Sequence, residues 1–204
     1  MKSDGHFHEI FSARPDWLYE LLGLPVPEHC KFTSPVLKTV QRQLDGFLTG
    51  EGEPPRVVEV QMQHDDHIYF RTGMEWAQVA MQPGHAHARA IIVFGTKSLD
   101  PRTPLWCDFI PVVYLDEALE RLRTERPEHP LVSVLFPFME ADNAILATEA
   151  PVHYRRIQSH GGSPAEIAVL LRVLLDFLLQ RLPNLNHHKI AMMLNFPPLE
   201  ETEG

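Results

Sequence analysis

The sequence predicts an α/β fold in which a mixed β-sheet is flanked by helices. Residues 56–63 (RVVEVQMQ) alternate between apolar and polar side chains, which is the period of a β-strand. Residues 88–94 are a continuous apolar run, typical of a strand buried on both faces. Segments with apolar residues at helical spacing precede, separate and follow these strands. That order is typical of a layered α/β domain.

The first part of the chain is predicted to contain helices and then antiparallel strands. Residues 6–23 have helical spacing, and a restart is expected at Pro15 because proline fits only the first turn of a helix. Residues 36–63 are predicted to hold antiparallel strands, with residues 49–55 as a turn-rich connection. Asp45-Gly46 is either a turn or a bend in a strand.

A helix is predicted near residues 66–82, capped by Asp65-Asp66 and stopped by Pro83-Gly84. Its predicted apolar stripe is Tyr69, Phe70, Gly73, Trp76, Ala77, Ala80 and Met81, and its other face carries Arg71, Glu75 and Gln78. A further strand at 109–115 contains Pro111, which indicates a sheet edge or a strand start. A helix is expected from Asp116.

The chain is predicted to comprise a core at residues 1–126 and a helical extension at 127–204 that packs on the core. The clearest helix of the extension is 164–182, where leucines recur at helical spacing, and a short helix is expected at 187–195. The apolar run at 131–139 fits either a helix or a strand.

Composition limits the classes of function. The 204 residues have a formal net charge of −9, which argues against a protein that coats DNA through bulk charge. An enzyme with one local basic patch is still compatible, and Lys31, Lys38 and Arg42 are the candidates for DNA contact. A homo-oligomer is also compatible with the sequence.

Cysteine and histidine spacing does not predict a zinc site. The two cysteines lack C-x-x-C spacing, and none of the twelve histidines joins a third ligand at a zinc-binding spacing. The sequence shows neither a signal-peptide pattern nor an apolar run long enough for a membrane span. A cytoplasmic protein without membrane contact is therefore expected.

Two carboxylates on neighbouring strands predict a divalent metal site. Asp45 and Glu59 could converge because cross-strand side chains lie about 5 Å apart. With the carbonyl of Val60, they would give Mg²⁺ the hard oxygen ligands it prefers. Gln61 points to the same face as Glu59 and could orient a water, which the metal would activate to cleave a phosphodiester.

Ordinary structural roles remain open for the same residues. Alternation places a glutamate on the solvated face of many strands, and Asp-Gly is common in turns. Asp65 could act as a helix cap, and Arg71 could form a helix pair with Glu75. Glu20 could lie on a solvated helix face or lean toward the metal, and His64 could be a general base or a surface histidine.

The ordered set of these residues resembles the PD-(D/E)xK nuclease superfamily. Within it, the chain is most similar to the recombination-promoting nuclease and transposase-like group, in which glutamine commonly replaces the lysine of the motif. The matching residues are Asp45, Glu59-Val60-Gln61, Asp65 and Arg71, together with the opening Phe7-His8-Glu9-Ile10-Phe11. Tyr114-Leu115-Asp116-Glu117 and Asn186…Ile190-Ala191-Met192-Met193-Leu194 resemble an uncharacterised bacterial branch, of the DUF2887 type.

This resemblance implies a restriction-endonuclease-like fold and DNA cleavage that depends on a divalent metal. The oxygen ligands favour Mg²⁺, for which Mn²⁺ could substitute. The resemblance makes Asp45 and Glu59 metal ligands, places Gln61 at the position of the lysine, and implies a role in DNA recombination or mobile elements. Gln61 departs from the motif because it carries no charge. The alternative is a catalytically weakened relative that binds DNA or a protein.

Overall fold

The computed structural model describes residues 4–34, 36–37, 42–103, 106, 108–182 and 190, with the backbone alone at 4, 36–37 and 42–43. The chain divides into two compact units, Met1–Ala118 and Leu119–Gly204. The division predicted from the sequence was at residue 126, after helix α5 (Leu115–Glu125), whereas the two units divide within α5.

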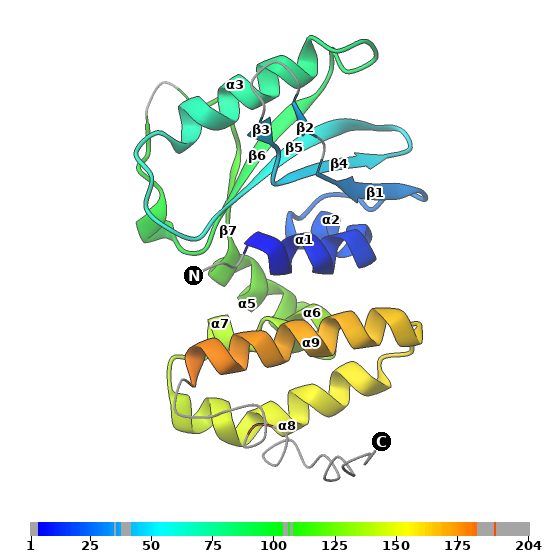
Figure 1. The fold of residues 1–204 in the computed structure, drawn as a ribbon, viewed down its shortest axis with the longest axis vertical. Coiled ribbons are helices and arrows are strands. Elements are labelled where there is room, and N and C mark those ends of the chain that lie inside the picture. The colour runs from blue at the N-terminus through cyan, green and yellow to red at the C-terminus, as the bar shows by residue number, and fades with distance from the viewer. Residues whose placement is uncertain are drawn as a thin grey trace, which may run out of the picture. The chain divides into compact units, whose positions relative to one another are not determined.

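The first unit is built on a five-stranded sheet with the order β1-β4-β5-β6-β7 (Figure 1). Its strands are β1 (Cys30–Thr33), β4 (Gly46–Gly50), β5 (Glu53–Gln61), β6 (Arg89–Phe94) and β7 (Val112–Tyr114). The β1–β4 and β4–β5 pairs are antiparallel, and the β5–β6 and β6–β7 pairs are parallel, so the predicted mixed sheet is confirmed. β2 (Val36–Leu37) and β3 (Arg42–Gln43) form a separate antiparallel pair.

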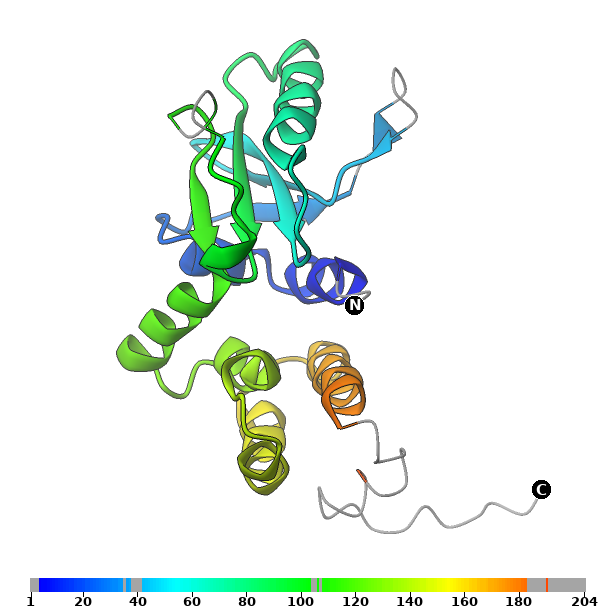
Figure 2. The ribbon, with the colours of Figure 1, turned by 90° about the vertical axis from the view of Figure 1, so that its left-hand side faces the viewer.

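Helices cover both faces of this sheet (Figures 1 and 2). α1 (Asp4–Ala13) and α2 (Pro15–Leu21) lie on one face, and the predicted restart at Pro15 is confirmed. The rings of Phe11 on α1 and Phe32 on β1 are 5.9 Å apart, centroid to centroid. α3 (Ile68–Ala80) lies on the other face, where its Ile68 belongs to the same buried cluster as Val57 of β5.

The inward face of α3 differs from the predicted apolar stripe. Phe70 and Met81 were expected in that stripe but are exposed, whereas Glu75 is buried. Tyr69 and Gly73 of the predicted stripe are buried as expected, and Arg71 and Glu75 lie close enough to Glu59 to change its pKa. The inward face of this helix therefore combines apolar packing with electrostatic contacts to Glu59.

The strand predicted near Pro111, at a sheet edge or a strand start, is confirmed. β7 begins directly after Pro111 and is the last strand of the sheet. Pro111 still contributes its carbonyl, which accepts a hydrogen bond from the backbone N–H of Ile92 at 3.1 Å. The short helix η1 (Lys97–Leu99) follows β6, and α5 follows β7 without a loop.

Asp45-Gly46 is the bend at which β4 begins, and Gly46 lies under the ring of Phe32. A Cβ atom added at Gly46 would lie 2.1 Å from two atoms of that ring. Gly46→Ala is therefore expected to destabilise the protein by about 2 kcal/mol, as for other overpacked core positions. Urea unfolding measures this loss. Gly5→Ala is the control because no atom lies within 4 Å of a Cβ there. Equal unfolding midpoints for the two variants would contradict the prediction.

The second unit is helical in its described part. Its helices after α5 are α6 (Pro130–Val134), α7 (Phe136–Met139), α8 (Asn143–Ser159) and α9 (Pro164–Arg181). α9 confirms the predicted helix at 164–182 and starts at a capping box between Ser163 and Glu166. The ambiguous run at 131–139 is helical. Apart from Ile190, the predicted helix at 187–195 lies outside the described residues.

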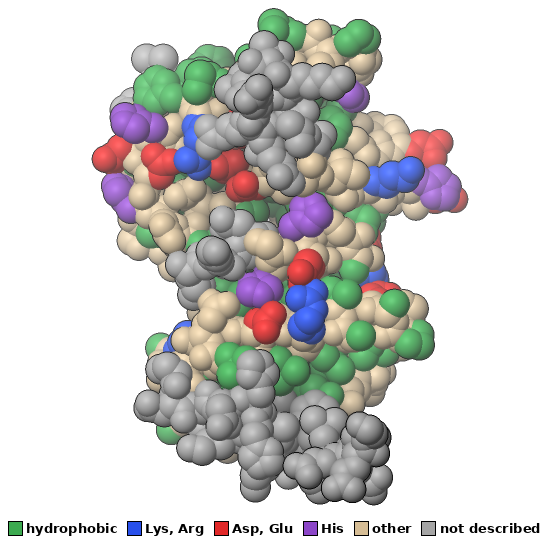
Figure 3. Space-filling model, in the orientation of Figure 1, with side chains coloured by type: hydrophobic (Ala, Val, Ile, Leu, Met, Phe, Trp, Pro, Cys, Tyr) green, Lys and Arg blue, Asp and Glu red, His purple; other side chains and the backbone are tan. Residues whose placement is uncertain are grey.

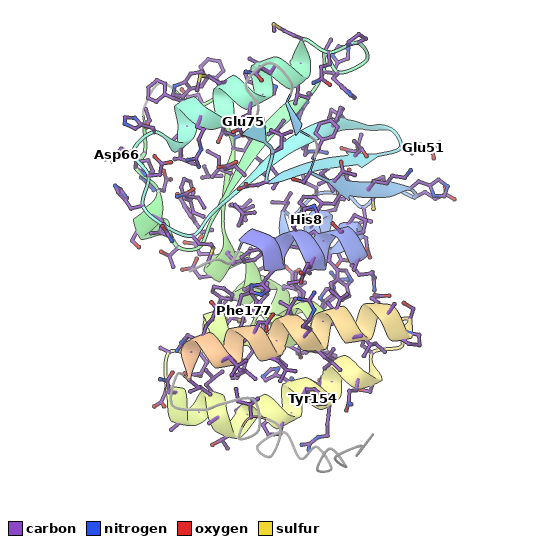
Figure 4. All side chains as sticks on the ribbon, in the orientation of Figure 1. His8, Glu51, Asp66, Glu75, Tyr154 and Phe177 are labelled. Carbon is purple, nitrogen blue, oxygen red and sulfur yellow. The ribbon has the colours of Figure 1, made fainter. Side chains whose placement is uncertain are left out.

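Aromatic contacts connect the helices of this unit. The ring of Phe177 on α9, marked in Figure 4, packs edge-on against Phe138 of α7 at 4.7 Å between centroids. The ring of His153 on α8 stacks on Phe136 at 3.9 Å, and its Nδ1 lies 3.1 Å from the hydroxyl of Ser133. His153 is buried, and burial lowers its pKa to about 4, with a further decrease from the charge of Arg156.

Candidate functional site

The candidate residues lie where β5 ends. β5 and β6 run in parallel, and the N–H of Gly95 donates to the carbonyl of Gln61 at 3.0 Å, so both strands end at the same sheet edge. The loop to α3 leaves from this edge. Ligands of open α/β sheets generally bind beyond the carboxyl ends of parallel strands.

The structure brings Asp45 next to β5. Gly46 pairs with Val58 in the antiparallel register, so the next position of that register sets Asp45 opposite Glu59. An Oδ2 atom of Asp45 accepts a hydrogen bond from the backbone N–H of Val60 at 3.2 Å. The N–H and carbonyl of one strand residue point toward the same neighbouring strand. The Val60 carbonyl is thus directed to the side of β5 on which Asp45 lies.

Glu59 is buried on the α3 face of the sheet, with 3% of its surface exposed. The alternative that it lies on a solvated strand face is therefore wrong. Burial raises its pKa well above the ordinary value, and the negative charges of Asp45 and Glu75 raise it further, whereas Arg71 lowers it. Asp45 and Glu75 are thus each close enough to Glu59 to repel its carboxylate electrostatically. A positive charge at this place is therefore favourable.

Arg71 is the positive charge that the structure places there. Its Nη2 lies 2.5 Å from Oε1 of Glu59, and its Nη1 lies 2.6 Å from Oδ2 of Asp65. The same Nη2 donates to the side-chain carbonyl of Gln61 at 3.2 Å. Arg71 therefore joins the strand, the loop and the helix, which is more than the predicted helix pair with Glu75.

Gln61 is held at both ends of its amide. Its carbonyl oxygen accepts from Arg71, and its amide nitrogen donates to the backbone carbonyl of Gln63. The side chain is nearly buried and has a fixed orientation, which suits the positioning of a water or a substrate oxygen. It cannot supply a charge, and Arg71 is the neighbouring group that can.

The loop residues have more local roles. Asp65 accepts from the backbone N–H of His67 at 2.8 Å and also pairs with Arg71, so it both shapes the start of α3 and belongs to the site. The ring of His64 is exposed and lies 3.0 Å from a carboxylate oxygen of Asp66. This exposed pair is typical of a surface histidine.

Two other groups of predicted residues, Glu20 and the basic residues, either lie away from these contacts or fall outside the described part of the chain. Glu20 is on α2, which covers the opposite face of the sheet from α3, and the causes of the Glu59 pKa shift do not include it. Lys31 is exposed on β1. Lys38 and the side chain of Arg42 are outside the described residues, so a basic patch formed by these three remains a prediction.

Glu75 is the site residue that sequence reasoning did not single out. It lies one helical turn after Arg71, is 4% exposed, and raises the pKa of Glu59 through its charge. Figure 4 marks Glu75 on α3 and Asp66 in the loop before that helix. The available signal was its spacing of four residues from Arg71, since residues at that spacing share a helix face.

The donor set fits a hard divalent cation held by two carboxylates. Asp45 and Glu59 supply carboxylate oxygens and Val60 supplies a carbonyl on the same side, and Mg²⁺ uses such oxygens while it keeps several waters. In the part of the chain that the structure describes, no group of three or more His, Cys, Asp or Glu side chains has a metal-binding arrangement. A cation bound here would therefore have two carboxylates as side-chain ligands, with Arg71 next to Glu59.

The surface near this site is mixed in charge. In Figure 3, acidic, basic and histidine side chains lie beside one another on the left of the first unit, where the loop from β5 to α3 runs. Among the helices described, none combines the length and the apolar character that a membrane crossing requires.

Comparison with known proteins identifies one family. A sequence profile described as "Protein of unknown function (DUF2887)" matches residues 3–194. No curated protein and no solved structure matches the chain.

Proposed function

The chain belongs to the DUF2887 family, and we propose that it is a divalent-metal-dependent DNA endonuclease with a restriction-endonuclease-like sheet, acting in DNA recombination or on mobile elements. The observation that carries this proposal is the convergence of Asp45 and Glu59. Asp45, in the bend directly before β4, accepts a hydrogen bond from the backbone N–H of Val60, next to Glu59 on the adjacent antiparallel strand β5.

The residues divide into ligands and positioning groups. Asp45, Glu59 and the Val60 carbonyl would hold Mg²⁺ or Mn²⁺, which would polarise a phosphate oxygen and lower the pKa of a bound water. Gln61 orients a water or substrate oxygen through its fixed amide. Arg71 holds Gln61 and Glu59 in place and supplies the positive charge that stabilises negative charge on the phosphate in the transition state.

Cleavage of a supercoiled plasmid tests the proposal. The purified chain with Mg²⁺ or Mn²⁺ is expected to nick the plasmid, whereas Glu59→Ala and Asp45→Ala are expected to lose at least about a hundredfold in rate, the order of magnitude for loss of an essential electrostatic group. Glu117→Ala, at an exposed position of α5, is the matched control and should cleave like the parent. Equal activity in all four proteins would indicate a contaminating nuclease and overturn the proposal.

Metal binding has a readout that does not depend on cleavage. A ligand at one hundred times its dissociation constant stabilises the native state by about 2.7 kcal/mol. Mn²⁺ should therefore raise the melting temperature of the parent and of Glu117→Ala, and leave that of Glu59→Ala unchanged. A shift of the same size in Glu59→Ala would place the bound ion elsewhere.

A second candidate is favoured by the contact between Arg71 and Glu59. The guanidinium neutralises the glutamate at 2.5 Å, so the buried charge is compensated within the chain itself. A catalytically weakened relative that binds DNA or a protein partner would keep this arrangement. Such a protein would show no nicking with either metal and no Mn²⁺-dependent increase in melting temperature, and DNA binding without nicking would identify DNA as its partner.

A further inference from the structure

Aromatic side chains gather at the start of α3, close to the candidate site. We define the aromatic edge as Phe70, Trp106 and Phe109. Phe70 is 46% exposed and Phe109 is 69% exposed, whereas Trp106 is partly buried against the core. Exposed apolar side chains that form a contiguous patch mark interaction sites, whereas singly scattered ones do not.

The aromatic edge is built by specific packing. The rings of Phe70 and Trp106 meet edge to face, 5.8 Å apart at an angle of 79°. A Cβ atom at Gly73 would lie 3.0 Å from two atoms of the indole, so the absence of a side chain lets Trp106 lie against the helix. The backbone N–H of Phe109 donates to the carbonyl of Trp106 at 2.9 Å, so a local turn holds the backbones of these two residues close together.

The aromatic edge adjoins the candidate site through both chain segments that form it. Phe70 directly precedes Arg71 on α3, and Trp106 and Phe109 belong to the connection after β6, which ends at the same sheet edge as β5. The same connection carries two exposed cations, Lys97 and Arg102. Exposed rings and cations thus occur together on the two chain segments that leave the sheet edge at which β5 and β6 end.

The geometry points to a single-stranded or locally unpaired DNA segment as the ligand, with its bases stacked on the aromatic edge and its phosphate directed to the carboxylates. This inference rests on the proposed function and adds the class of substrate. Bases paired in a duplex hide their π-faces, whereas unpaired bases stack on aromatic side chains regardless of sequence. Lys97 and Arg102 would meet the phosphates of such a strand, and the formal charge of −9 disfavours broad contact with a duplex.

Fluorescence anisotropy tests the inference. A labelled twelve-nucleotide oligo-dT and a hairpin duplex of equal charge are titrated with the chain in Ca²⁺, which takes the same oxygen ligands as Mg²⁺. The parent should bind the single strand at least tenfold more tightly than the duplex. The double variant Phe70→Ala/Phe109→Ala should lose about tenfold or more on the single strand and little on the duplex. Because Phe70 packs on Trp106, a small fall in melting temperature is expected, and binding is measured well below the melting temperature of the double variant.

A matched control and the contrary outcomes complete the test. Ile145→Ala removes an apolar side chain of similar exposure (47%) from α8 in the second unit and should bind like the parent. Equal binding by the double variant and the parent, or a preference for the duplex, overturns the inference. The inference is also overturned if light scattering shows a dimer for the parent and a monomer for the double variant, because the aromatic edge would then join two copies.

Failure of this inference can be told apart from failure of the proposed function. Binding that depends on the aromatic edge without nicking in Mg²⁺ or Mn²⁺ supports the substrate class and refutes the hydrolase. Nicking that depends on Glu59 but not on Phe70 or Phe109 supports the hydrolase and refutes the substrate class.

Discussion

Arg71→Ala is expected to lower the rate of plasmid nicking by about 10²–10³-fold, the size of effect seen when one preorganised electrostatic donor is removed. The guanidinium of Arg71 contacts Glu59, Asp65 and Gln61. Its removal releases the amide of Gln61 and takes away the positive charge next to the carboxylates. Arg71→Lys should recover only part of the rate, because an ammonium group lacks the planar set of N–H donors with which the guanidinium holds two carboxylates.

The fall in rate should appear in kcat more than in KM if Arg71 acts in the transition state. Arg123→Ala is the matched control, since Arg123 forms an exposed ion pair with Glu120, and pairs of this kind contribute little. A comparison of melting temperatures separates lost activity from lost folding. Nicking by Arg71→Ala within threefold of the parent would show that this residue only supports the fold.

Acidification is expected to destabilise the second unit through His153. Its pKa is lowered from 6.5 to about 4 by burial and then by Arg156, so the folded state holds the ring neutral. The stability that depends on the neutral ring is complete above pH 6.5, falls as the pH drops from 6.5 toward 4, and is lost below 4. At 1.36 kcal/mol for each pKa unit, the loss is about 3 kcal/mol.

Urea unfolding followed by far-UV circular dichroism at pH 7, 6, 5 and 4 measures this loss. Carboxylates also titrate in this range, so the informative quantity is the difference between the parent and His153→Gln. The glutamine does not titrate but retains a polar group for the Ser133 hydroxyl. His64→Gln, at an exposed histidine, should follow the parent at every pH. Parallel profiles for the parent and His153→Gln would contradict the prediction.

Much of the fold could be predicted because local patterns and tertiary structure agree. The alternation at 56–63 predicted the strand, and Glu59 and Gln61 lie on one face of it. The leucine-rich run at 164–182 predicted α9, and Pro111 predicted an edge strand. Each of these signals is set by the geometry of one element, so it can be read without knowing what that element packs against.

The inward face of α3 could not be predicted in the same way. An apolar stripe was expected to mark it, yet Phe70 is exposed and Glu75 is buried. The reason is the buried carboxylate of Glu59, which Arg71 compensates from the helix. A buried charge needs a partner, and the identity of that partner depends on the orientation of the helix, which no local pattern records.

The sequence by itself determined the strand that carries Glu59, the neighbouring segment that carries Asp45, and the helix that follows, because strand and helix periods depend only on residue order. Only the tertiary structure decided that Asp45 is bonded at Val60, that Arg71 binds Glu59, and that Phe70 faces solvent beside Trp106. These contacts join segments distant along the chain. They follow from the pairing of the strands and the rotation of α3, which arise from burial and charge compensation in the whole unit.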